Sequence, residues 1–76
     1  MGVTQLRSAY MVRTTYVKER NLPDRLDFYS DSGSACLRAL TICQRVKGIT
    51  EANVYKITKI TGRSDLQVDI HKCFKP

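Results

Sequence analysis

Two stretches near the start of the chain alternate between apolar and polar residues, and a turn separates them. Residues 9–19, AYMVRTTYVKE, are rich in β-branched and aromatic side chains, which predicts a strand. Residues 20–24, RNLPD, carry the Asn, Pro and Asp that are typical of turns. Residues 25–30, RLDFYS, follow as a short second strand, so a hairpin is the simplest connection. In it we expect Leu26 and Phe28 to face inward, and Asp27 and Tyr29 outward.

The pattern then changes to a helical period in SDSGSACLRALTICQRVKG, residues 30–48. Asp31, or else Ser30 or Ser32, is the expected N-cap, and Gly48 is the expected left-handed C-cap. On a helical wheel one broad face holds Ala35, Cys36, Ala39, Leu40, Ile42, Cys43 and Val46. The opposite face holds Ser34, Arg38, Thr41 and Arg45, and Leu37 lies outside the main apolar arc.

Strand patterns return in the last third of the chain. EANVYKITKITG, residues 51–62, is followed by a turn in TGRSD, residues 61–65, and by alternation in LQVDIHKCF, residues 66–74. In this last strand we expect Leu66, Val68 and Ile70 to face inward, with Gln67, Asp69, His71 and Cys73 outward. The element order is therefore strand–strand–helix–strand–strand.

This order predicts an α+β fold, in which one antiparallel sheet carries a single helix on one face. The 76 residues fit one domain, 1–76, with 1–8 and 75–76 as short tails. One helix can cover only one side of the sheet. The other side must meet water or a partner.

Charge gives the strongest functional signal. The net charge of +6 and the pI of about 9.6 favour phosphates or an acidic protein surface as partner, although a small domain also needs charge to stay soluble. We expect Arg13 and Lys56 on the outer face of the sheet, with Thr15, Thr58 and Gln67 between them. The candidate partner-binding residues are Arg13, Arg20, Arg25, Arg38, Arg45, Lys56 and Arg63. Arg20, Arg25 and Arg63 are expected in turns, and Arg38 and Arg45 on the exposed helix face.

Catalytic and metal chemistry receive little support from the sequence. The three cysteines form no CxxC pair, and the first twelve residues lack the pattern of a secretory signal, so free thiols in a reducing cytosol are expected. Cys36 and Cys43 lie on the apolar helix face, where core packing is a better explanation than metal binding or redox chemistry. His71 and Cys73 offer two zinc ligands on one strand face, but no second pair matches them. We predict no enzyme, no cofactor and no membrane span.

Two segments carry a resemblance to known proteins. NVYKITKI, residues 53–60, resembles the last strand of the small archaeal ribosomal protein LX, and DFYSDSGSACLRAL, residues 27–40, resembles the capped helix that follows a hairpin in that family. The same layout is similar to small phage-encoded host-takeover proteins, such as the short-tailed coliphage inhibitor of bacterial RNA polymerase. The resemblance covers residues 10–61. This chain departs from both groups by its added strand, residues 66–74, and by a helix without acidic residues, so no functional residue is carried over.

Together these features predict a small, basic, non-enzymatic binding protein. We expect a phage or mobile-element inhibitor in the cytoplasm of a bacterial host. It would dock on a nucleic-acid-handling protein complex such as RNA polymerase or a CRISPR effector. The alternative is a ribosomal or regulatory protein that binds RNA or DNA directly. The sheet has two open edges, so a homodimer through edge strands is compatible with both.

Overall fold

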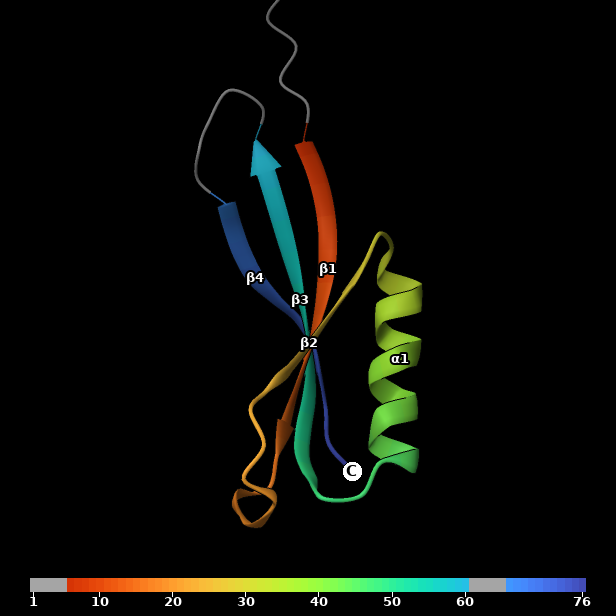
Figure 1. The fold of residues 1–76 in the computed structure, drawn as a ribbon. Helices are drawn as coiled ribbons and strands as arrows, with labels where there is room; N and C mark the ends of the chain where they lie inside the picture. The colour runs from red at the N-terminus through yellow and green to blue at the C-terminus, as the bar shows by residue number, and fades with distance from the viewer. Residues whose placement is uncertain (1–5, 61–65) are drawn as a thin grey trace, which may run out of the picture.

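The computed structural model describes residues 6–60 and 66–76, which form an antiparallel sheet with one helix against it (Figure 1). The strands are β1 (Leu6–Tyr16), β2 (Arg25–Tyr29), β3 (Ile49–Ile60) and β4 (Leu66–Phe74). The helix α1 spans Ser32–Arg45, and a short 3₁₀ helix, η1, spans Lys18–Arg20. The predicted α+β class and element order are confirmed. β1 starts earlier than expected, so residues 6–8 belong to a strand and not to a tail.

The four strands lie in the order β2-β1-β3-β4, and every neighbouring pair is antiparallel. The connection through α1 carries the chain from β2, on one side of β1, to β3 on the other. The helix packs mainly against β1 and β3, the two central strands. In Figure 1 the start of β1, the end of β3 and the start of β4 extend past the helix. That end of the sheet is therefore covered by no helix among the described residues.

The N-terminus of α1 is capped as the sequence predicts, but its C-terminus is not. Asp31 is the N-cap, as expected: its carboxylate accepts hydrogen bonds from Ser34 N at 2.7 Å and from Ser34 Oγ at 2.9 Å. These two bonds stabilise the charged form and lower the pKa of Asp31. The C-cap is Val46 and not Gly48 as predicted. Gly48 has φ +80°, so its left-handed conformation serves the loop into β3.

The completely buried apolar centre of the core between helix and sheet is built from small side chains, with Ile42 and Ile49 beside it. Val12, Val54, Ala35, Ala39 and Ala52 are completely buried. The alanines allow the helix backbone to lie close to the sheet. Cys36 and Cys43 pack against this cluster, which confirms the expected packing role of the helix cysteines.

We call the side of the sheet that contacts α1 the helix face, and the other side the open face. Val12 and Val54 pair with each other and are buried under α1, so the even-numbered residues of β1 and β3 lie on the helix face. In β2, Tyr29 pairs with Tyr10, and both pack against the core. The expected orientation of β2 is therefore wrong: Leu26 and Phe28 lie on the open face. The hairpin register decided this, because it places Tyr29 beside Tyr10 on the helix face and Phe28 beside Met11 on the open face.

The expected orientation of β4 is also wrong, and the cause is a β-bulge. Val54 pairs with Lys72, but the next residue, Tyr55, pairs with Ile70, so His71 is an extra residue. Because of the bulge, even-numbered residues lie on the open face before His71 and on the helix face after it. Phe74 packs against the core, whereas Leu66, Val68 and Ile70 lie on the open face.

Candidate functional site

The open face carries a continuous apolar surface that crosses all four strands. One row of paired residues runs Phe28, Met11, Tyr55, Ile70 from β2 to β4. A neighbouring row runs Ala9, Ile57, Val68 across β1, β3 and β4. With the flanking Leu26 and Leu66 these rows form what we call the apolar band: Ala9, Met11, Leu26, Phe28, Tyr55, Ile57, Leu66, Val68 and Ile70.

The large side chains of the apolar band are exposed on the edge strands β2 and β4, whereas Met11, Tyr55 and Ile57 on the central strands are half-buried. Phe28 is 64% exposed and Ile70 is 60% exposed, and Leu26, Leu66 and Val68 are each about half exposed. Single exposed apolar residues are common, but a contiguous exposed patch usually marks an interaction surface. The pairing register makes these residues contiguous, because cross-strand neighbours on one face lie side by side.

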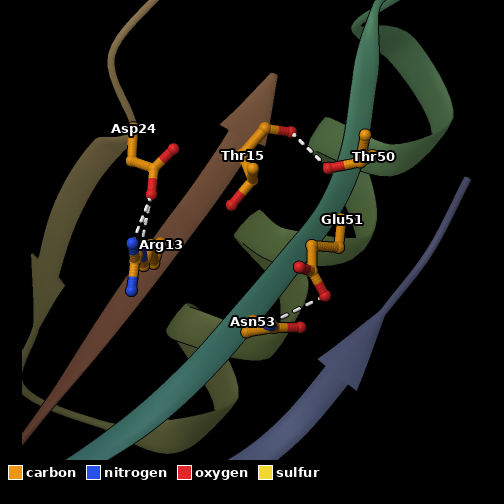
Figure 2. Close-up of polar contacts among 6 residues, drawn as sticks. All are labelled: Arg13, Thr15, Asp24, Thr50, Glu51 and Asn53. Carbon is orange, nitrogen blue, oxygen red and sulfur yellow. Dashed lines mark hydrogen bonds and ion pairs between the residues drawn. The ribbon is translucent and has the colours of Figure 1, made fainter. Parts of the chain in front are cut away.

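A polar row borders the apolar band on one side. In it Arg13 pairs with Asn53 in β3, and Asn53 pairs with Cys73 in β4. The Arg13 guanidinium lies 2.6 Å from the Asp24 carboxylate, and this ion pair raises the pKa of Arg13 (Figure 2). Asn53 Nδ2 donates to Glu51 Oε2 at 3.1 Å. Apolar centre and polar rim together are the usual anatomy of a protein interface.

Figure 2 also shows a contact that holds the ends of β1 and β3 together: the Thr50 hydroxyl donates to the Thr15 carbonyl at 3.2 Å. A register shift between Thr15 and Tyr16 lies at this end of the pair. This hydrogen bond joins β1 to β3 at the end of the sheet next to the polar row.

The predicted basic residues do not form one patch. Arg13 lies on the open face, but Lys56 pairs with Tyr10 and lies on the helix face, so their expected shared face is wrong. Alternation along β3 shows that Lys56 lies on the other face from Tyr55 and Ile57. Only the position of α1 showed which of these two faces the helix covers. Arg25 is the first residue of β2 and not part of the turn, and it lies 3.2 Å from Asp27 in an ion pair.

The remaining predicted cations are divided between loops and helix. Arg20 Nη1 donates to the Lys47 carbonyl at 2.5 Å, and its guanidinium lies 5.6 Å from the centre of the Tyr16 ring. Arg20 thus ties the β1–β2 loop to the α1–β3 loop, which is a structural role. Arg38 and Arg45 lie on α1, half-buried and exposed respectively. Arg63 and the predicted turn 61–65 lie outside the described residues.

Cys36, Cys43 and His71 pack against neighbouring side chains, whereas Cys73 is exposed. Burial raises the pKa of the Cys43 thiol, which keeps it protonated and a poor nucleophile at neutral pH. The His71 ring lies edge-on against Tyr10, with ring centres 5.4 Å apart, on the helix face. Cys73 lies on the open face, so the bulge separates the expected His71–Cys73 pair.

Within residues 6–60 and 66–76, no three His, Cys, Asp or Glu side chains group as metal ligands. In the same part of the chain no helix has the length and apolar character needed to cross a membrane.

Comparison of the chain with family models, with curated protein sequences and with solved structures found no match. Only the residues of the site therefore indicate what the protein binds. Sequence reasoning missed the apolar band because it placed its members in β2 and β4 on the inner face: Leu26, Phe28, Leu66, Val68 and Ile70. The available signal was quantitative: one 14-residue helix cannot cover the apolar side chains of four strands.

Proposed function

We propose that this chain is a non-enzymatic binding protein whose open sheet face docks on a partner protein. The observation that carries the proposal is the apolar band, an exposed surface that runs across the four strands with a polar row beside it. Burying these side chains on a partner provides the driving force, at about 25 cal/mol per Å² of apolar area. The polar row around Arg13 and Asn53 orients the partner.

A protein partner is favoured over nucleic acid by the composition of this face. Phosphate recognition needs several cations directed at the ligand. By strand register the described open-face cations are Arg7, its pairing partner Lys59, and Arg13, which Asp24 already neutralises. Phe28 and Tyr55 are suitable for stacking on bases, and Tyr29, which was expected outward, lies on the helix face. Aliphatic side chains dominate the rest of the band and favour a complementary apolar surface.

The charge of +6 adds a preference for an acidic partner, because it accelerates encounter with negatively charged surfaces. An acidic protein complex of a bacterial host, as expected for a phage or mobile-element inhibitor, is one partner of this kind. The open face supports docking on a protein surface, but it carries no information about the organism from which the chain comes. Direct binding of RNA or DNA is the second candidate, supported by the net charge alone.

The test is a capture experiment from nuclease-treated bacterial lysate with three baits. These are the wild-type chain, the open-face double variant Leu26→Ser/Phe28→Ser in β2, and the control Leu37→Ser. Leu37 is 66% exposed on α1, so the control removes a similar exposed side chain from the other side of the molecule. A captured protein must then bind the purified chain directly.

We expect the same protein with the wild type and the control, and at least a tenfold weaker interaction with the double variant. Equal binding by all three baits would contradict docking through the open face. Capture that requires nucleic acid would favour the second candidate.

A further inference from the structure

We propose that β4 pairs edge to edge with β4 of a second copy of this chain, in antiparallel orientation. The inference does not depend on the docking function, because it concerns the backbone edge of the sheet and not its open face. β4 pairs with β3 and lies at the end of the strand order among the described strands. Its outer N–H and C=O groups are therefore available to another strand.

The first half of β4 lacks most of the features that protect natural edge strands. Leu66, Gln67, Val68, Asp69 and Ile70 are all exposed and regularly paired with β3 on their inner side. Charges, prolines and bulges normally block such edges. Here Asp69 is the one charged residue within residues 66–70, whereas the bulge at His71 and the cation Lys72 lie in the second half and limit further pairing to residues 66–70.

The segment LQVDI is chemically symmetric about Val68. In antiparallel pairing centred on Val68, Leu66 of one copy lies opposite Ile70 of the other, and Gln67 lies opposite Asp69. These polar side chains already match within one chain, where Gln67 Nε2 donates to Asp69 Oδ2 at 3.0 Å. The Asp69 carboxylates of the two copies lie opposite amides and not opposite each other, so this register is free of like-charge pairs.

The other edge strand is less suited to self-pairing. β2 has the sequence RLDFY, with Asp27 at its centre. Pairing two copies over their full length would place one Asp27 directly opposite the other, and like charges opposite each other are destabilising. The charge patterns of the two edges therefore select β4.

Antiparallel pairing of two identical β4 strands creates a two-fold axis, and this symmetry has a consequence for the open face. An axis perpendicular to the sheet keeps both helices on one side and both open faces on the other. The apolar bands of the two copies then meet at Leu66, Val68 and Ile70 and form one wider surface. Each copy carries a charge of +6, so salt should strengthen the association by screening repulsion. Binding to an acidic partner should weaken with salt, which separates the two interactions.

The test is sedimentation equilibrium of the purified chain at low and high salt, with two variants at one position. Gln67→Lys places a cation opposite Asp69 of the other copy and should lower the dimer dissociation constant about three- to tenfold. Gln67→Asp places two acids opposite each other and should raise it by a similar factor. Gln67 is on the helix face, so neither change alters the open face. Phe28→Ser, in the apolar band but far from β4 in the strand order, is the control and should dimerise normally.

Hydrogen exchange at high and low protein concentration locates the interface. Amides within residues 66–70 should gain protection in the dimer, whereas those of β2 should not. A wild-type chain that stays monomeric at about 1 mM would overturn the proposal. Dimers that respond in the same direction to Gln67→Lys and Gln67→Asp would also overturn it, as would dimers lost in Phe28→Ser. None of these results decides the capture experiment, since the two surfaces are altered separately.

Discussion

The two faces of the sheet use apolar residues in opposite ways. The helix face buries small side chains such as Val12, Val54 and Ala52, whereas the open face exposes larger ones such as Phe28 and Ile70. In most small domains the largest apolar residues form the core. Here the centre of the core consists of Val and Ala, larger side chains such as Ile42 and Phe74 surround it, and several other bulky side chains remain on the side that no described element covers. Apolar character alone therefore does not identify the core of this protein.

The sharpest test of this difference is the same substitution on each face. Ile42 of α1 is 4% exposed and Ile70 of β4 is 60% exposed. Ile42→Ala should lower the free energy of unfolding by about 2–5 kcal/mol, because it removes buried methylenes and leaves a cavity. Ile70→Ala should change it by less than about 0.5 kcal/mol. Urea unfolding of dilute protein measures both. Equal losses would show that the open face contributes to folding.

The loop that positions α1 over the helix face gives the next largest effect. Gly48 has φ +80°, and an added Cβ would collide with Cδ of the Arg20 side chain. Gly48→Ala should therefore destabilise the fold by about 1 kcal/mol or more. Thermal unfolding measures the change, and Gly33→Ala is the control, because its added Cβ would meet only Asp31 Oδ2 at 3.3 Å. A neutral result at Gly48 would mean that the loop does not hold the helix.

The N-cap of α1 should give a smaller, pH-dependent effect. Hydrogen bonds from Ser34 hold the pKa of Asp31 below its ordinary value of 3.8. The charged cap therefore stabilises the fold above about pH 4, and this contribution is lost as the pH falls through the folded-state value. Asp31→Asn keeps an accepting oxygen but cannot titrate there. The stability difference between wild type and Asp31→Asn should shrink from pH 5 toward pH 2, and a constant difference would contradict the assigned cap.

The smallest effect is expected at the polar row of the open face. Arg13 and Asp24 form an exposed ion pair at 2.6 Å, and such pairs contribute little because water and salt screen them. Arg13→Gln should leave the unfolding midpoint almost unchanged while altering the salt dependence of partner binding. A marked loss of stability would show that the polar row supports the sheet itself.

Much of the fold could be predicted from local patterns. Alternating residues located β2 and β4, the Asp31 cap located the start of α1, and the helical wheel identified Ala35, Ala39 and Ile42 as buried. These features depend on neighbours in the chain, so they are present in the sequence. The candidate site could not be predicted in the same way. The proposed arginines lie on different faces and loops, because charge composition contains no information on position.

Alternation with period two shows which residues of a strand share a face, but it does not show which face a helix will cover. That choice required the strand order β2-β1-β3-β4, the register that pairs Tyr29 with Tyr10, and the bulge at His71. Each is a contact between residues distant in the chain. The sequence alone thus specified the elements and their order. Tertiary pairing decided that Phe28, Val68 and Ile70 face outward: the hairpin register placed Phe28 on the open face, and the extra residue in β4 exchanged the faces of Val68 and Ile70 relative to Phe74.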